Sequence, residues 1–248
     1  MIPVSVVVVT KDEEKNIERA LKSVSAFDDI VVLDAFSSDA TVGICGKYTD
    51  RVYQREWMGY ARQKQAAVDL AANPWVLILD ADERVTEGLA EEIKKRMKGS
   101  GPDGFYVPRK NFFLGRWIRH SGWWPDYTLR LFRKDVSRVE FREVHEKVVV
   151  DGPVDYLRQP LEHYTYGTIS DYVRKMENYS TLSAAELHNK KAAPYVLSML
   201  VNPFWVFVKM FFLRQGFRDG VHGFILAGLY GFYTFLKYAK MWEKKRVG

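Results

Sequence analysis

The first third of the chain alternates short apolar runs with segments of helical character. The apolar runs cover residues 4–9, 30–33 and 76–79, and a polar residue follows each. Short runs of this kind are typical of strands buried on both faces. Helices are expected between and after them, over residues 17–24, 41–48, 60–72 and 86–97. Strands that alternate with helices predict βαβ units, and therefore an α/β domain with a mostly parallel, Rossmann-like central sheet.

The pattern changes after residue 97. Short strands are expected over residues 105–108, 129–132 and 147–150, and an aromatic, basic segment lies between the first two. From residue 168 the apolar positions return to helical spacing. We therefore expect one domain over residues 1–165 and a helical region over residues 166–248.

The helical region contains two apolar stretches, residues 196–213 and 221–236. Spanning a bilayer takes about 20 mostly apolar residues, and each stretch is too short or is interrupted. Both are rich in aromatic residues, and the second is followed by Lys237, Lys240, Lys244, Lys245 and Arg246. Aromatic residues with basic flanks predict helices at the surface of an anionic membrane. The alternatives are an ordinary helical subdomain, a homo-oligomer interface through these helices, or a two-pass hairpin.

Composition narrows the choice of partners only slightly. The formal net charge of +6 is compatible with nucleic acid, anionic lipid or a phosphorylated substrate. We find no nucleic-acid-binding motif and expect no nucleic-acid partner. The single cysteine, Cys45, excludes an internal disulfide. The N-terminus has no basic region before its first apolar run, so we expect no signal peptide.

Polar residues with metal- and phosphate-binding chemistry follow the three apolar runs. Thr10 follows the first run, Asp34 the second, and the pair Asp80 and Asp82 the third. In a parallel sheet these strand ends lie on one edge, where α/β proteins bind their ligands. Paired carboxylates there supply hard oxygen ligands for a divalent cation beside a phosphorylated ligand. The alternative is that each acid is a turn or helix-capping residue.

At these positions the sequence resembles a known family. The segments VVVVTKDEE (6–14), IVVLDAFSSDAT (30–41) and LILDADE (77–83) resemble the nucleotide-sugar half of family 2 inverting glycosyltransferases of GT-A fold. Further along, YTLRLFR (127–133), VHE (144–146) and GFRDG (216–220) resemble the branch with lipopolysaccharide-core β-glucosyltransferases. The resemblance covers nearly the whole chain. One departure is Lys11-Asp12, where many relatives have Tyr-Asn, so the aromatic stack on the base is missing there.

The resemblance implies a GT-A catalytic domain in residues 1–165, with roles for the strand-end residues. Those that would hold a uridine-type nucleotide are Thr10, Glu13 and Asp34. Asp82, with help from Asp80, would bind the Mg²⁺ or Mn²⁺ that bridges the two phosphates of a nucleotide sugar. Lys64 or Arg62 would assist at the phosphates, unless they only form a solvated helix face.

An inverting transfer also needs a carboxylate that takes the proton from the acceptor hydroxyl. The candidates are Asp126, Glu143 and Glu146. We expect Glu146 to be this base, with Asp126 as the alternative. His145 beside it is expected to be a metal ligand or a phosphate contact. His120 and His163 are expected to be structural or surface residues.

An acceptor site is expected next to Asp126. Trp123 and Trp124 precede it, and aromatic rings suit the faces of sugars. Arg130 is also expected to contact the acceptor. The alternative is that Arg130 and the nearby arginines pair with the candidate bases.

Together these features predict a metal-dependent hexosyltransferase at the cytoplasmic face of the inner (plasma) membrane. It would transfer a hexose, with UDP-glucose as the expected donor, to a lipid-linked saccharide such as the lipopolysaccharide inner core. An alternative with the same chemistry has a polyprenyl-phosphate-linked acceptor. An alternative of another class is a non-catalytic nucleotide- or nucleic-acid-binding module.

Overall fold

The computed structural model describes residues 1–99, 101–140, 147–189 and 195–247. The expected base Glu146, the further candidate Glu143 and the expected ligand His145 lie outside these residues. The chain forms two compact units. Unit 1 consists of Met1–Arg109 and Asp126–His163, and unit 2 of Lys110–Pro125 and Tyr164–Gly248. The sequence predicted a catalytic domain over residues 1–165 and a helical, membrane-associated region over residues 166–248. The functions of these two regions stay predictions.

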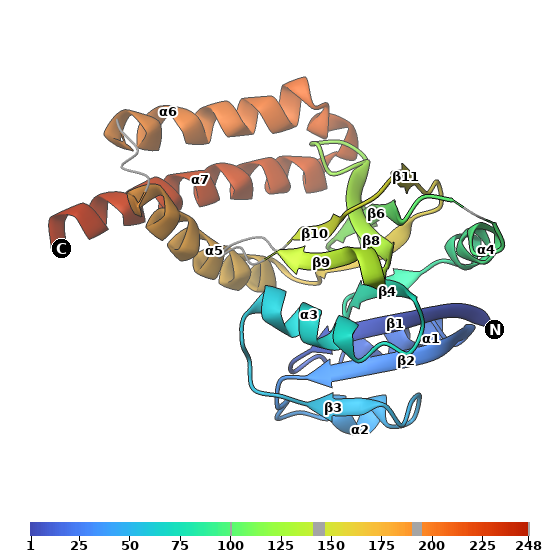
Figure 1. Cartoon of the computed structure of the whole chain (residues 1–248). Helices are drawn as coiled ribbons and strands as arrows, with labels where there is room; N and C mark the ends of the chain where they lie inside the picture. The colour runs from blue at the N-terminus through green and yellow to red at the C-terminus, as the bar shows by residue number, and fades with distance from the viewer. Residues whose placement is uncertain (100, 141–146, 190–194, 248) are drawn as a thin grey trace. The chain divides into compact units, whose positions relative to one another are not determined.

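Parallel strands form the first half of the sheet in unit 1 (Figure 1). They are β1 (Ile2–Thr10), β2 (Phe27–Asp34), β3 (Val52–Gln54) and β4 (Trp75–Asp80). β1 lies between β2 and β4, and β3 pairs with the outer side of β2. The buried apolar runs therefore form the parallel strands that the sequence predicted.

The second half of the sheet is mostly antiparallel. β8 (Asp126–Arg133) runs antiparallel to β4, and β6 (Gly104–Phe113) runs antiparallel to β8. β11 (Val154–Tyr156) runs parallel to β6, and β12 (Leu161–Tyr166) pairs antiparallel with β5 (Glu83–Val85). β5, β11 and β12 were not predicted, because they are short or contain many polar residues.

Helices cover one face of the parallel strands. α1 (Ile17–Ser23), α2 (Thr41–Cys45) and α4 (Glu87–Arg96) pack on the face that carries Val6 and Val8. Thr86 caps the N-terminus of α4, because its hydroxyl accepts a hydrogen bond from Leu89 N at 3.2 Å. These apolar contacts hold the strands in place, and so they also position the polar residues at the strand ends.

The opposite face of the same strands carries Val7 and is covered by α3 (Tyr60–Asp69). The antiparallel pair of β9 (Ser137–Glu140) and β10 (Lys147–Val150) completes this layer. A short 3₁₀ turn, η1 (Lys134–Val136), precedes β9. Because alternate valines of β1 enter different layers, this strand is buried on both sides.

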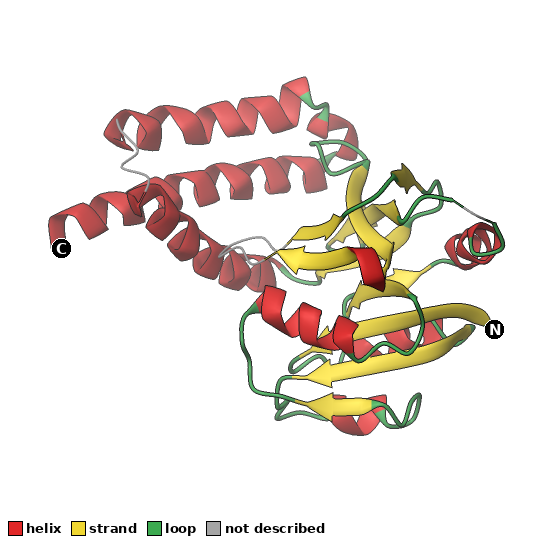
Figure 2. Cartoon of the chain, viewed as in Figure 1, coloured by secondary structure: helices red, strands yellow, loops and turns green. Residues whose placement is uncertain are grey.

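Unit 2 is mainly helical (Figure 2). Its elements are β7 (Arg116–Trp117), α5 (Ile169–Asn189), α6 (Tyr195–Val208), the π-helical turn η2 (Lys209–Leu213), the 3₁₀ turn η3 (Gly216–Asp219) and α7 (Val221–Val247). Its core gathers Phe113, Trp123, Tyr172, Met210 and Leu226. At Gly223 a Cβ atom would lie 1.9 Å from the carbonyl oxygen of Gly216, so the start of α7 packs directly against the backbone of η3.

One helical stretch stands out by its exposure. Val196–Leu213 has a mean hydropathy of 1.8, yet only 6% of it is buried. Leu200 and Phe204 are 66% and 71% exposed. By length and composition alone, this is the one helix in the described part of the chain that could cross a membrane.

Candidate active site

The strand-end residues of unit 1 lie side by side. Thr10 is the register partner of Asp34, and Val9 is the register partner of Asp80. The side chains at the ends of β1, β2 and β4 therefore share one edge of the sheet, as the sequence predicted. In open α/β sheets this edge binds the ligand.

Hydrogen bonds brace the loop after β1 against the loop after β2. Asp12 N donates to Ser37 Oγ at 2.8 Å, and Asp12 Oδ1 accepts from Ser38 N at 2.7 Å. Glu13 N donates to Thr41 Oγ1 at 2.8 Å. The TKDEE and DAFSSDAT segments are therefore joined by a set of hydrogen bonds.

Asp34 is fully buried and contributes to this bracing. Its Oδ2 accepts hydrogen bonds from Ser37 N at 2.8 Å and Gln54 Nε2 at 3.2 Å. Thr10 is also buried, and its hydroxyl has no hydrogen-bond partner among the described residues. The expected nucleotide contacts of these residues and of Glu13 stay predictions.

Phe36 is a feature of this edge that the sequence pattern did not predict. Its side chain is 54% exposed, and its φ of 54° lies in the left-handed region that non-glycine residues seldom adopt. Backbone strain of this kind is often found at functional sites. Phe36 thus places an exposed aromatic ring two residues beyond Asp34.

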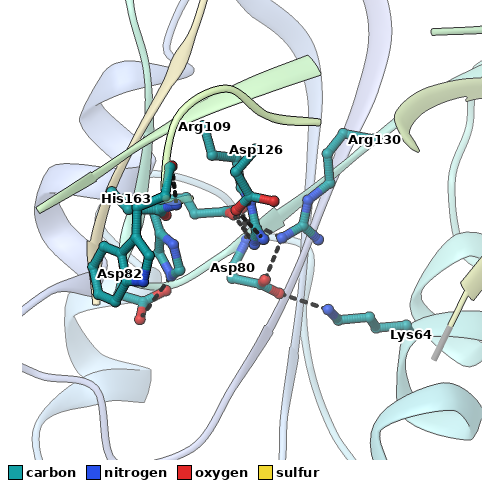
Figure 3. A network of polar contacts seen from close by, with 10 residues as sticks. Lys64, Asp80, Asp82, Arg109, Asp126, Arg130 and His163 are labelled. Atoms are coloured by element: carbon teal, nitrogen blue, oxygen red, sulfur yellow. Dashed lines mark hydrogen bonds and ion pairs between the residues drawn. The ribbon is translucent and has the colours of Figure 1, made fainter. Parts of the chain in front are cut away.

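Asp80 lies between two positive charges (Figure 3). Lys64 Nζ from α3 lies 2.8 Å from Asp80 Oδ1, and Arg130 Nη2 from β8 lies 2.5 Å from Asp80 Oδ2. Lys64 and Arg130 are both buried. A metal ion at Asp80 would compete with two cations already in place, which argues against the expectation that Asp80 is a direct metal ligand.

The network continues through Glu83, which is fully buried. Arg130 Nη2 lies 2.7 Å and Arg109 Nη1 lies 3.5 Å from Glu83 Oε1. Glu83 Oε2 accepts a hydrogen bond from Asp80 N at 3.0 Å. Arg109 in turn donates to Asp126 Oδ2 from Nε at 3.0 Å and from Nη2 at 2.6 Å. Positive and negative groups therefore alternate from Lys64 to Asp126.

These pairings keep Asp80 and Arg130 charged. Burial alone would raise the pKa of the Asp80 carboxyl, but the charges and hydrogen bonds of Arg130 and Lys64 hold it well below its usual range. Burial alone would lower the pKa of Arg130, but Asp80 and Glu83 raise it.

Asp82 has a different neighbour. Its Oδ2 lies 3.5 Å from His163 Nε2, and both side chains are 14% exposed (Figure 3). His163 is in β12, where it is the register partner of Glu83. The sequence did not predict this proximity, because β12 was not predicted, and the expectation that His163 is a structural or surface residue stays a prediction.

The described residues contain no group of three or more His, Cys, Asp and Glu side chains able to hold a metal ion. Asp82 and His163 supply two suitable donors, a carboxylate oxygen and an imidazole nitrogen. His145, the expected third ligand, lies outside the described residues. The donor set therefore fits a metal that shares its remaining positions with a ligand or water.

The acceptor residues expected from the sequence need revision. Trp123 is 9% exposed, and its ring contacts Phe113 and Tyr230 in the core of unit 2. A ring buried in this way cannot also stack on a sugar. Arg130 is 4% exposed and donates hydrogen bonds to Asp80 and Glu83, which leaves little of its side chain for contact with an acceptor. Trp124 is only half-buried, and its acceptor role stays a prediction.

Comparison with known proteins identifies the family. Residues 5–150 match the model of glycosyl transferase family 2. The chain belongs to this family. The Asp80–Asp82 pair and the braced loops after β1 and β2 all lie within the matched residues.

Whole-length relatives agree with this family. Lipopolysaccharide core biosynthesis glycosyltransferase LpsC of Rhizobium meliloti (strain 1021) is 28% identical, over 98% of this chain and 93% of LpsC. An uncharacterised glycosyltransferase of Rickettsia felis (strain ATCC VR-1525 / URRWXCal2) is 30% identical, over 98% of this chain and 90% of that protein. This family 2 glycosyltransferase is thus homologous to a lipopolysaccharide-core enzyme.

Solved structures confirm the GT-A class of fold. The 1–349 fragment of S. aureus TarS, crystallised with UDP-GlcNAc, superimposes with a TM-score of 0.51 at 16% identity. The alignment covers 100% of this chain and 92% of the TarS chain. The expected α/β architecture with C-terminal helices is therefore correct.

The lowered pKa of Asp80 predicts a specific loss of stability in acid. A carboxyl whose pKa is lower in the folded state stabilises the fold above its unfolded pKa of about 3.9. This contribution is lost as the pH falls through the folded pKa. Asp80→Asn should lower the free energy of unfolding by roughly 1–3 kcal/mol near neutral pH, and it should flatten the acid dependence. Urea unfolding from neutral pH into acid measures both effects.

The control for this comparison is Glu56→Gln, which changes an exposed carboxylate. It should leave both the stability and its pH dependence close to wild type. Identical acid profiles for wild type and Asp80→Asn would contradict the electrostatic role of the Lys64–Asp80–Arg130 contacts.

Proposed function

We propose that this glycosyltransferase transfers a hexose from a UDP-sugar to a lipid-linked saccharide, with UDP-glucose as donor and a lipopolysaccharide inner core as acceptor. The observation that carries the proposal is the similarity to LpsC along nearly the full length of both proteins. TarS shares the fold and was crystallised with UDP-GlcNAc, which supports a uridine nucleotide in the donor. A polyprenyl-phosphate-linked acceptor remains the alternative, whereas nothing in the family supports a non-catalytic nucleic-acid-binding module.

The donor would bind at the carboxyl edge of the parallel strands. Thr10, Glu13 and Asp34 would hold the nucleoside directly or through the braced loops, and the exposed ring of Phe36 could stack on the base. Lys64 would act mainly by fixing Asp80. Because hydrogen bonds already hold these loops together, binding requires little reordering of the backbone.

Asp82 and His163 would hold a Mg²⁺ or Mn²⁺ ion, with His145 as a third candidate ligand. The ion would neutralise the negative charge that develops on the departing diphosphate. Asp80 would orient this site through Lys64 and Arg130 instead of binding the metal. The two aspartates are given different roles because Asp80 is paired with Lys64 and Arg130, whereas Asp82 lies beside His163.

Glu146 remains the proposed base, and Asp126 the alternative. Arg109 Nε and Nη2 both donate hydrogen bonds to Asp126 Oδ2. Such a clamp suits a carboxylate that is held in place more than one that accepts a proton, since protonation would weaken both bonds. Asp126 would then position Arg109 and Glu83.

The C-terminal helices would attach the enzyme to an anionic membrane, where a lipid-linked acceptor is found. The exposed apolar residues of Val196–Leu213 support this, together with the basic end of α7. Lys240 is less suited to lipid contact, because its Nζ donates to Glu177 O at 3.0 Å and Ser180 Oγ at 2.9 Å. Association of two copies through these helices is the competing explanation of the exposed surface.

Loss of a metal ligand should reduce the increase in nucleotide affinity that the metal ion causes. In Asp82→Asn and His163→Gln, the gain in UDP affinity on adding Mn²⁺ should fall at least about tenfold, because each variant removes a donor. Calorimetric titration with UDP, with and without Mn²⁺, measures this gain. His222→Gln on α7 is the control and should behave as wild type. A full Mn²⁺ effect in both site variants would exclude them as ligands.

Removal of the base should slow transfer without weakening donor binding. Glu146→Gln keeps the shape of the side chain but cannot take the proton, so kcat should fall by about 10²–10⁴-fold. Single-turnover transfer and UDP titration separate the two effects. Should Asp126→Asn show this pattern instead of Glu146→Gln, the assignment is reversed.

Membrane binding should depend on the basic end of α7. Each Lys or Arg near an anionic surface contributes about 1 kcal/mol. The variant that tests this carries Gln at Lys237, Lys244, Lys245 and Arg246. It should detach from anionic liposomes in a flotation assay and still hydrolyse UDP-glucose. Its control carries Gln at four exposed lysines of unit 1: Lys22, Lys47, Lys94 and Lys98. Equal release of both variants, or a wild type that ignores liposomes, would refute the membrane role.

A further inference from the structure

Unit 2 contains a basic hollow that the donor chemistry does not use. Its volume is about 420 Å³, and its lining residues are Arg116, Trp117, Arg119, His120, Arg218 and Asp219. We call it the arginine hollow. Two of its residues belong to the GFRDG segment (216–220), which has no role in the site described above.

Asp219 holds the wall of the arginine hollow together. Its carboxylate accepts hydrogen bonds from His120 N at 2.9 Å and Arg119 N at 3.4 Å, and it contacts His120 Nδ1 at 3.1 Å. Asp219 is 3% exposed. Both carboxylate oxygens of Asp219 are therefore occupied by groups of residues 119–120.

The arginines of the hollow are available for an anion. The guanidinium carbon of Arg119 lies 4.3 Å from the centroid of the Trp117 ring, which restricts the side chain before a ligand binds. Arg218 Nη1 donates to Gln215 Oε1, a neutral acceptor, at 2.7 Å. Within residues 1–99, 101–140, 147–189 and 195–247, no carboxylate forms an ion pair with the guanidinium of Arg116, Arg119 or Arg218.

This chemistry suits a phosphate group. Planar guanidinium groups bind phosphate oxygens in pairs, and they do so better than lysine ammonium groups. The hollow has the volume of an ordinary small-molecule site, for which about 300–1,000 Å³ is typical. Beside it, the rings of Trp117 and Trp124 meet edge to face with centroids 5.3 Å apart, and Trp124 is half-buried. An aromatic surface next to an anion site fits a phosphate that is attached to a sugar.

We propose that the arginine hollow binds a phosphate ester on the saccharide acceptor, so that the enzyme selects phosphorylated acceptors. The assignment of this phosphate to an acceptor depends on the glycosyltransfer proposed above, whereas the anion site itself does not. Arg116, Arg119 and Arg218 bind the phosphate oxygens, and Trp124 contacts the adjoining sugar. Trp123, which is buried, has no part in this contact.

The test uses the full-length chain with glucose 6-phosphate as the probe and glucose as its uncharged counterpart. Binding is followed by the change in the NMR chemical shift of the Trp117 indole N–H. This resonance is assigned by its absence from the spectrum of Trp117→Phe. Glucose 6-phosphate should shift this resonance to saturation at low ionic strength, and glucose should not. In the triple variant Arg116→Gln, Arg119→Gln, Arg218→Gln, the affinity should fall by at least about tenfold.

A charge-matched control carries Lys22→Gln, Lys47→Gln and Lys98→Gln, and it should bind the probe as wild type does. Equal binding by the triple variant and this control would overturn the proposal. Circular dichroism and thermal unfolding show whether each variant is folded. If the triple variant is not, Arg119→Lys keeps the charge but loses the planar group, and it should still weaken binding several-fold.

A second measurement separates a saccharide phosphate from a lipid headgroup. Vesicles of phosphatidylcholine with phosphatidic acid present the same phosphate chemistry on a bilayer. If the triple variant loses vesicle binding but keeps its affinity for glucose 6-phosphate, the saccharide assignment is wrong. A wild type that binds glucose 6-phosphate in the hollow but neither binds UDP nor hydrolyses UDP-glucose would refute the proposed function and leave the anion site standing.

Discussion

The active-site edge depends on one buried carboxylate, Glu83. A buried charge is tolerated only where opposite charges and hydrogen bonds compensate for lost hydration. Arg130, Arg109 and the backbone N–H of Asp80 supply that compensation. The same contacts tie the end of β4 to β8 and β6, so the stability of this corner and the orientation of the site residues have one physical origin.

The sequence predicted the parallel half of the fold because burial on both faces leaves a local signal. β1 contains the valine run 6–9 and β4 the apolar run 76–79, and the polar residues that follow these runs mark the edge of the candidate site. β12 leaves no such signal, since Leu161–Tyr166 mixes apolar, aromatic and charged residues. Its place is set by pairing with β5, a contact between distant parts of the chain, and this pairing brings His163 to Asp82.

Residue type alone also could not distinguish the roles of neighbouring side chains. Trp123 and Trp124 are identical and adjacent, yet the first is a core residue and the second is half-buried. Asp80 and Asp82 differ in the same way, because α3 and β8 bring cations to the first and β12 brings an imidazole to the second. In each pair the difference arises from tertiary packing.

The interleaved division of the chain has a consequence for how it can be dissected. Lys110–Pro125 lies between two segments of unit 1 in the sequence but belongs to unit 2. The polypeptide therefore passes from one unit to the other three times, at residues 109–110, 125–126 and 163–164. A single cut after residue 163 would leave the first fragment with a piece of the other unit's core, including Phe113 and Trp123. Neither unit is one continuous stretch of the chain, so no single cut yields two fragments that each contain one whole unit.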